Sequence, residues 1–152
     1  FAAMPRLLER AGTSPRGTIT GLYTVLVESD DMDEPISDSA RSILDGHIVL
    51  SRKLANRGHY PAIDVLESVS RLKTEVTDED HKRNSLKILE ILSNYYESED
   101  LIKIGAYQHG TNPKIDEAIA KIDAINDFLK QDMNESCNMD ITKEKLAELV
   151  QE

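Results

Sequence analysis

The chain has 152 residues, of which 39% are hydrophobic and 30% charged, so it can bury one core of ordinary size or two small ones. No stretch approaches the roughly 20 apolar residues of a membrane span, and the N-terminus lacks the features of a secretory signal. The single cysteine, Cys137, excludes an intramolecular disulfide, and the four scattered histidines show no zinc spacing. We therefore expect a folded protein of the reducing cytoplasm without a metal site.

The net charge of -10 is unevenly distributed along the chain. Residues 1–73 hold 10 acidic and 9 basic residues, a net charge of -1, whereas residues 74–152 hold 18 and 9, a net charge of -9. This asymmetry predicts two units with different surroundings, and it argues against nucleic acid as a partner of the second. A basic protein partner is favoured by charge complementarity.

The first elements along the chain indicate an α/β arrangement. An apolar face near the N-terminus, followed by Gly12, predicts the end of a helix with a glycine C-cap. Residues 18–27, TITGLYTVLV, are typical of a buried strand covered on both faces. A short amphipathic helix at about 36–44, closed by Gly46, leads to a second strand at 47–51. Strand, helix and strand at this spacing predict a parallel crossover.

From Thr77 onward, the apolar period changes to that of a helix. Thr77 and Asp80 resemble a capping box with Asp in place of the usual Glu. The helix is expected to run to about Ile104, with an apolar stripe that comprises Leu86, Leu89, Leu92 and Tyr96.

Two further helices are predicted after a turn at 105–110. Asn112 and Pro113 are a favourable N-cap and first-turn pair, and a third, shorter helix begins near Thr142. The second helix has an apolar stripe formed by Ile115, Ile119, Ile122, Ile125 and Leu129. The sequence therefore predicts an all-helical unit at 74–152, following an α/β unit at 1–73.

An α/β unit raises the question of nucleotide binding. The phosphate loop G-x-x-x-x-G-K-[ST] requires a Gly-Lys pair, and the 152 residues contain none. We therefore do not expect this chain to bind or hydrolyse a nucleoside triphosphate by itself. Residues 22–31, LYTVLVESDD, have the general form of a magnesium-binding Walker B strand. Apolar strands also end in Asp simply because turns favour it.

Three segments carry a resemblance to a known family: residues 46–72, which read GHIVLSRKLANRGHYPAIDVLESVSRL, the DDMDEP stretch at 30–35 and LIKIGAYQHG at 101–110. They closely resemble the flagellum-specific ATPase, the export ATPase of bacterial flagella, which is related to type III secretion ATPases and to the catalytic subunits of rotary ATP synthases. The resemblance covers essentially the whole chain. It implies the C-terminal part of a RecA-like P-loop ATPase domain, followed by an all-helical C-terminal domain.

The resemblance also implies which parts of the family lie elsewhere. The N-terminal β-barrel, the phosphate loop, the catalytic glutamate and the Walker B strand of the family would all precede Phe1. The strand matching 18–27 would follow the Walker B strand, which argues against a metal-binding role for the acids after it.

By this resemblance, two residues between positions 58 and 72 match residues with known roles in the family. Arg71 matches the arginine finger that acts across the boundary between neighbouring subunits, where a permanently charged guanidinium stabilises the transferring phosphoryl group. Tyr60 matches the aromatic residue against which adenine packs, with Pro61 restricting its backbone. The alternatives are a surface salt bridge for Arg71 and a core tyrosine for Tyr60. His47 and His59 are interpreted as structural.

Acidic residues form the expected partner surface. In the family, the loop that carries Asp30, Asp31 and Asp33 faces the central shaft, which in export ATPases is a small coiled-coil stalk protein. Candidate contacts in the helical unit are Glu97, Glu99 and Asp100. The alternative for both groups is an ordinary solvated surface.

The resemblance implies a homo-hexameric ATPase that energises flagellar type III protein export from the cytoplasm, at the base of the export apparatus. ATP with Mg²⁺ would bind in the full-length protein, and no cofactor is expected in this chain alone. Expected partners are the stalk, export-apparatus proteins, and export substrates or their chaperones, with no nucleic acid and membrane contact only through partners. The alternatives are the virulence (injectisome) version of the same ATPase, and a non-enzymatic acidic helical module that binds a coiled-coil stalk.

Overall fold

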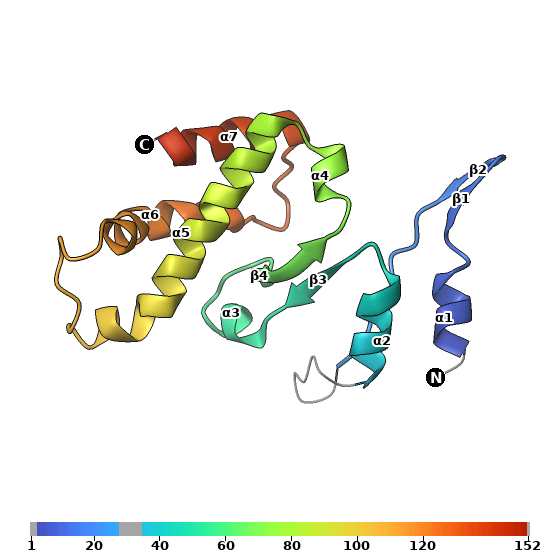
Figure 1. The fold of residues 1–152 in the computed structure, drawn as a ribbon, viewed down its shortest axis with the longest axis horizontal. Coiled ribbons are helices and arrows are strands. Elements are labelled where there is room, and N and C mark those ends of the chain that lie inside the picture. Colours follow the sequence, from blue (N-terminus) through green and yellow to red (C-terminus); the bar gives the residue numbers. More distant parts are fainter. Residues whose placement is uncertain (1–2, 28–34, 152) are drawn as a thin grey trace. The chain divides into compact units, whose positions relative to one another are not determined.

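A computed structural model describes residues 3–27 and 35–151 (Figure 1). The chain forms two compact units, residues 1–47 and 48–152. Within the described ranges, no helix combines the length and apolarity needed to cross a membrane. The acidic stretch with Asp30, Asp31 and Asp33 lies outside the described residues.

The first unit contains two helices and a hairpin: α1 (Ala3–Leu8), β1 (Gly12–Ser14), β2 (Gly17–Ile19) and α2 (Pro35–Ile43). The two strands pair antiparallel, with Gly12 opposite Ile19. Leu8 on α1 and Ala40 on α2 are buried, and the two helices are in contact. The predicted C-cap at Gly12 is wrong, because α1 ends at Leu8 and Gly12 begins β1.

The predicted strand at 18–27 is also wrong for most of its length. Only Gly17–Ile19 is a strand, and residues 20–27 have no regular secondary structure. The side chains of Leu22 and Leu26 are 94% and 91% exposed. An extended segment becomes a stable strand only when a neighbouring strand pairs with its backbone groups, and none does so within the described ranges. The predicted parallel crossover from this segment is therefore absent from the described structure.

The second sheet lies next to the helical part of the chain. It consists of β3 (Gly46–Leu50), which confirms the strand predicted at 47–51, and β4 (Ile63–Ser70), with α3 (Arg52–Asn56) in the connection and α4 (Lys73–Val76) after it. The two strands run in opposite directions (Figure 1). Val65 on β4 packs against the main hydrophobic core. Because β4 and the helices share the compact unit 48–152, the boundary between 73 and 74 stays a prediction.

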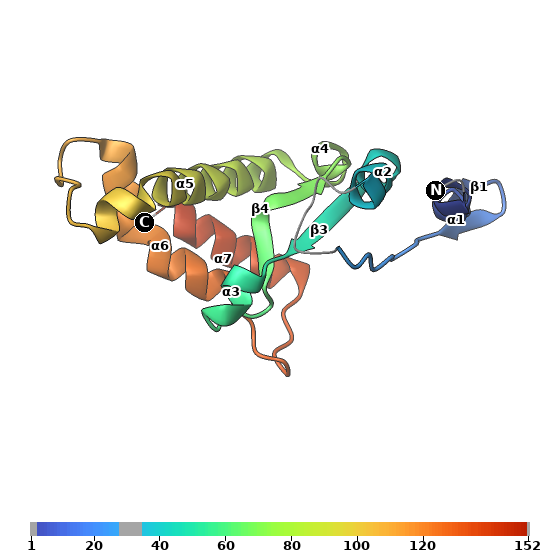
Figure 2. The same ribbon diagram turned by 90° about the horizontal axis from the view of Figure 1, so that it is seen from below.

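Three helices hold that core: α5 (Glu79–Lys103), α6 (Pro113–Leu129) and α7 (Met139–Gln151). Helices α6 and α7 both lie against α5 (Figure 2). The buried cluster comprises Ile88, Ile91, Leu92, Ala118, Ile122, Ile125 and Leu146. Its most enclosed large side chains, Ile91, Leu92 and Ile125, are at most 1% exposed. The third helix begins at Met139, slightly earlier than predicted.

The ends of α5 and α6 are determined by local chemistry. The N-cap of α5 is Asp78, not the predicted Thr77, and its carboxylate accepts a hydrogen bond from the His81 amide. At the other end, Gly105 has a φ of 70° and closes a Schellman motif, with the Ala106 amide bonded to the Leu101 carbonyl. Helix α6 begins as predicted, with the Asn112 side chain accepting from the Lys114 amide.

Helix α7 is joined to the other two helices by two lysines, Lys143 of α7 itself and Lys121 of α6. Lys143 Nζ lies 2.7 Å from the Asp78 carboxylate at the start of α5. Lys121 Nζ donates to the Leu149 carbonyl at 3.0 Å, near the end of α7. A cation near the last carbonyls of a helix also interacts favourably with the helix dipole.

The buried face of α5 leads to a test with two identical substitutions. Leu92 is 1% exposed and Leu86 is 62% exposed, although both belong to the predicted stripe. We expect Leu92→Ala to lower the free energy of unfolding by about 2–5 kcal/mol, because it leaves a cavity. Leu86→Ala should change it by less than about 0.5 kcal/mol. Urea denaturation of both variants measures the difference, and equal losses would contradict the burial described for α5.

The Asp78–Lys143 contact leads to a pH test. The hydrogen bond from Lys143 and that from the His81 amide lower the pKa of Asp78 to about 2. A carboxyl whose folded pKa is lowered contributes stability above its unfolded pKa, and that contribution disappears as the pH falls from about 4 towards 2. We expect Asp78→Asn, which still caps the helix, to lose this part of the acid dependence of the melting temperature.

The matched variants separate capping from charge. Asp78→Ala should melt lower than Asp78→Asn at neutral pH, because alanine also removes the cap. The control Asp80→Asn, on the exposed first turn of α5, should keep the acid dependence of the parent protein. An unchanged acid dependence in Asp78→Asn would contradict the assignment.

Candidate functional site

The GHYP segment, residues 58–61, begins as the end of a helix. Gly58 has a φ of 71° and follows α3 in a Schellman motif. Its amide donates to the Ala55 carbonyl, and the His59 amide donates to the Leu54 carbonyl, both at 3.0 Å. Glycine suits this left-handed position because it has no Cβ. The motif therefore determines the direction in which the chain leaves α3.

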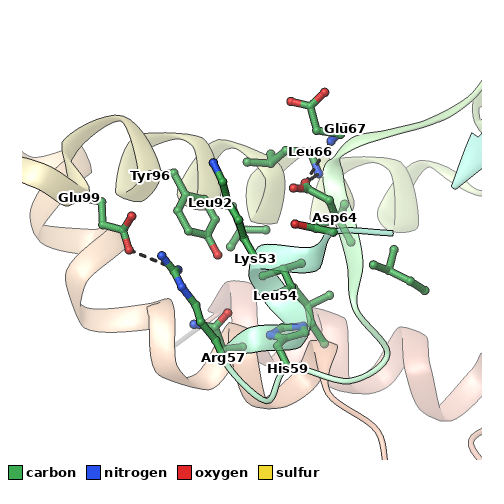
Figure 3. A pocket seen from close by; sticks show the side chains of 15 residues that line it. Lys53, Leu54, Arg57, His59, Asp64, Leu66, Glu67, Leu92, Tyr96 and Glu99 are labelled. Atoms are coloured by element: carbon green, nitrogen blue, oxygen red, sulfur yellow. Dashed lines mark hydrogen bonds and ion pairs between the residues drawn. The ribbon is translucent and has the colours of Figure 1, made fainter. Parts of the chain in front are cut away.

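His59 is buried directly after this turn. Its side chain lies beside Leu54 (Figure 3), and the residue is 6% exposed. Its Nε2 is enclosed without a hydrogen-bond partner. Burial, and then the positive charge of Lys130, lower the pKa of His59. The imidazole is therefore neutral at pH 7, and its position is consistent with the structural role expected for it.

Tyr60 differs from His59 because its ring faces solvent. The residue is 58% exposed, which does not agree with a core tyrosine. Its backbone is held, since the Tyr60 carbonyl accepts a hydrogen bond from the Gln131 amide at 2.9 Å and the Ile63 amide bonds to the Pro61 carbonyl at 2.8 Å. An exposed ring on a restrained backbone is available to stack against a flat ligand.

Arg71 follows the other end of β4. The strand spans Ile63–Ser70, so Tyr60 precedes it and Arg71 comes directly after it. Eight residues of a straight strand would extend about 26 Å, and β4 is bent (Figure 2), so this length is an upper limit. Arg71 is exposed and has an interaction of its own within the chain. Tyr60 and Arg71 therefore lie beyond opposite ends of the same strand.

A pocket of about 310 Å³ lies between α3, β4 and α5 (Figure 3). Its apolar wall includes Leu54 and Leu92, and neither Tyr60 nor Arg71 lines it. At its rim, the Arg57 guanidinium lies 3.5 Å from the Glu99 carboxylate. The described residues contain no cluster of three or more side chains suited to a metal ion.

The acidic residues of α5 fall into two groups. Glu97 and Asp100 are exposed, although Glu97 accepts a hydrogen bond from the Ser93 hydroxyl at 2.9 Å. The side chain of Glu99 is only 18% exposed and pairs with Lys103 at 2.8 Å as well as with Arg57. Its charge is therefore largely neutralised within the chain.

A hydrogen-bond network at the α5–α6 turn escaped the sequence reasoning. Asp116 is 18% exposed, and it accepts from the Tyr107 hydroxyl at 2.8 Å and from the Gly110 amide at 2.9 Å. His109 Nδ1 lies 2.8 Å from the same carboxylate. Burial opposes ionisation of Asp116, but these bonds outweigh it and lower its pKa. The sequence signal that could have indicated this network is an Asp in the first turn of a predicted helix, where a carboxylate is stabilised.

Comparison with known proteins matches the chain in two consecutive segments. Residues 1–70 match the ATP synthase alpha/beta family, nucleotide-binding domain, and residues 77–148 match the T3SS EscN ATPase C-terminal domain. The chain is 50% identical over 149 residues to the type 3 secretion system ATPase of Pseudomonas syringae pv. tomato, covering 98% of the chain and 33% of that protein. It is 53% identical over 135 residues to the flagellum-specific ATP synthase of Bacillus subtilis, covering 89% and 31%.

The fold matches that of solved type III secretion ATPases. The assembled ATPase EscN from enteropathogenic E. coli has a TM-score of 0.93 and 43% identity, covering 98% of this chain and 36% of that one. A second structure, of EscN in complex with its central stalk EscO, has a TM-score of 0.88 and 41% identity, covering 99% and 35%. The chain thus spans about a third of the length of these relatives.

These matches confirm the predicted fold class, in which the C-terminal part of a RecA-like ATPase domain is followed by a helical domain. The chain belongs to the type III secretion and flagellum-specific ATPases, with a nucleotide-binding segment of the ATP synthase alpha/beta family followed by their C-terminal domain.

Proposed function

We propose that this chain is the C-terminal part of an ATPase that energises type III protein export in the flagellar system. The observation that carries the proposal is the consecutive match to the two family segments, at about 50% identity to export ATPases of both kinds. The flagellar branch is proposed on the 53% identity to the Bacillus subtilis flagellum-specific protein, a value too close to those of injectisome proteins to separate the two branches by itself. The 50% identity to the Pseudomonas syringae protein supports the injectisome branch as the alternative.

ATP would supply the phosphoryl group that is transferred to water, and Mg²⁺ would accompany it in the full-length protein. The 152 residues fit only part of this ligand, because they contain an exposed aromatic ring but no Gly-Lys pair to hold the phosphates. We therefore propose that this chain contributes the Tyr60 ring as a stacking surface for the base and the Arg71 guanidinium as a cation for a neighbouring subunit's site.

Tyr60 is the proposed base contact in its own subunit. Its ring is exposed, and its backbone carbonyl accepts a hydrogen bond from the Gln131 amide. The ring can therefore stack against a base while its backbone stays in place. Stacking on an aromatic ring contributes about 1–3 kcal/mol per nucleic-acid base without selecting its edge.

Arg71 is the proposed arginine finger of a neighbouring subunit's site. Its position beyond the far end of β4 from Tyr60 supports this division, because a strand separates the proposed base contact from the proposed cation. A planar, permanently charged guanidinium is suited to the charge that spreads over the transferring phosphoryl oxygens. The proposal therefore requires a ring of identical subunits, for which we propose a hexamer.

The acidic side chains are the proposed contacts with a coiled-coil stalk. Glu97 and Asp100 are exposed, whereas Glu99 would have to exchange its lysine and arginine partners for those of the stalk. Asp30, Asp31 and Asp33 belong to the same proposal. Support comes from EscN, whose structure was solved in complex with its central stalk EscO. Export-apparatus proteins, substrates and chaperones would complete the set of partners at the cytoplasmic base of the apparatus.

The arginine finger has a direct test in the full-length enzyme. We expect Arg71→Ala to lower the rate of ATP hydrolysis by about 10³-fold or more, since a finger contributes 10³–10⁵ in related enzymes. ATP binding, measured with a fluorescent analogue, should largely survive. The control Arg83→Ala, which removes an exposed guanidinium paired with Asp80 on α5, should retain full turnover.

Mixing two inactive subunits makes this test specific for action between subunits. Arg71→Ala subunits mixed with subunits that lack the phosphate-loop lysine should regain part of the activity, because some interfaces then combine an intact finger with an intact phosphate loop. Unchanged turnover in Arg71→Ala would refute the finger, and a non-enzymatic module would show no ATP turnover in any variant.

Complementation decides between the two export systems. A flagellar export ATPase whose C-terminal segment is replaced by this chain should restore swimming to a strain that lacks the enzyme. The same replacement in an injectisome ATPase should restore effector secretion poorly, because the stalk and the export gate differ. A chimera with Arg71→Ala is the matched inactive control. Restored secretion without restored swimming would assign the chain to the injectisome branch.

A further inference from the structure

Among the described residues, one backbone hydrogen bond joins the GHYP segment to the helices α5 to α7 and their connections. The Gln131 amide donates to the Tyr60 carbonyl at 2.9 Å. Gln131 comes just after α6, so this bond connects a helix of the buried core to the residue that carries the exposed ring. The connection lies wholly within the compact unit 48–152.

The donor belongs to a loop that is hydrogen-bonded to itself. We define the 130–135 loop as the residues from Lys130, the C-cap of α6, to Glu135. The Asp132 amide donates to the Glu135 carboxylate at 3.2 Å, the Glu135 amide donates to the Asp132 carbonyl at 3.0 Å, and Gln131 Nε2 donates to the Glu135 carbonyl at 3.1 Å. These bonds restrain the loop that carries the Gln131 amide.

The loop is also anchored in the core through α6. Ile125, one turn before the end of the helix, is completely buried, and Leu129 packs against the same core cluster. The acceptor is equally restrained, because Gly58 closes the Schellman motif and His59 is buried beside Leu54. A hydrogen bond between two restrained segments has one geometry, so it transmits the position of one segment to the other.

We propose that the Gln131 backbone amide is a positioning group for the Tyr60 ring, so that the 130–135 loop sets how well the base is held. This inference rests on the proposed base contact of Tyr60 and deepens it. The Gln131 side chain does not reach the Tyr60 carbonyl, and its part is limited to the bond with the Glu135 carbonyl inside the loop, beside the bonds between Asp132 and Glu135. The helical domain would then affect nucleotide affinity through the end of α6.

Removing the amide hydrogen tests the proposal. In the full-length enzyme, Gln131→Pro deletes the donor, and Lys130 already has the extended backbone (φ −86°, ψ 148°) that a following proline requires. We expect KM for ATP to rise about fivefold with little change in kcat, as for the loss of one hydrogen bond of ordinary strength. Gln131→Ala keeps the amide and is the matched control, with KM within about twofold of the parent.

Two further variants distinguish failure of the inference from failure of the proposed function. Tyr60→Ala should raise KM about tenfold by removing the stacking surface. The double variant Tyr60→Ala/Gln131→Pro should have the KM of Tyr60→Ala, because the amide acts only through the ring. If Tyr60→Ala raises KM but Gln131→Pro does not, or if the two effects add, the positioning role is refuted while the base contact stands. An unchanged KM in Tyr60→Ala refutes both.

A measurement on the unmodified protein covers the case in which the proline variant does not fold. Hydrogen exchange of the Gln131 amide, followed by NMR, should be as slow as that of amides in the last turn of α6. The amide of residue 131 should exchange equally slowly in the Gln131→Ala variant, which keeps the N–H group. Exchange as fast as that of exposed loop amides would overturn the proposal, because a donor that opens freely cannot position the Tyr60 backbone.

Discussion

The shared hydrophobic cluster that buries Leu92 of α5 and Ile125 of α6 is the interaction on which the rest of the described unit depends. Both side chains are almost completely enclosed, together with Ile91 and Ala118 between the same two helices. Strand β4 joins this core through Val65, and α7 packs on the other two helices. Interiors packed at this density do not deform gradually, so the elements attached to the core keep fixed positions.

Strand β4, which is held against this core, lies between Tyr60 and Arg71 in the chain. A strand of eight residues is an extended spacer, and Tyr60 and Arg71 flank it on opposite sides. The strand thus stands between the two side chains, which suits the proposal that they belong to two different sites. The acidic surface is divided in a similar way, because Glu99 is neutralised by lysine and arginine partners within the chain whereas Glu97 remains exposed. Net charge alone therefore overestimates the charge available to a partner.

Features that depend on neighbours in the chain were predictable. The start of α6 at Asn112, the turn closed by Gly105 and the strand at 47–51 all follow from capping, backbone freedom and β-branched composition. The same locality explains the error at Thr77, because Asp78 beside it is an equally good cap and only the geometry chooses between them. The residues of the candidate site were found through motif resemblance, which carries the family assignment but not their contacts.

The sequence by itself determined the family, the three C-terminal helices and the start of α6, because these depend on contiguous residues. Only the tertiary structure decided which face of α5 is buried, since Leu86 and Leu92 have the same side chain and differ only in what packs on them. It also decided that residues 20–27 form no strand, because strand formation needs partners from elsewhere. The bond from Gln131 to Tyr60 is of the same kind: every residue but proline has a backbone amide, so its partner is visible only in space.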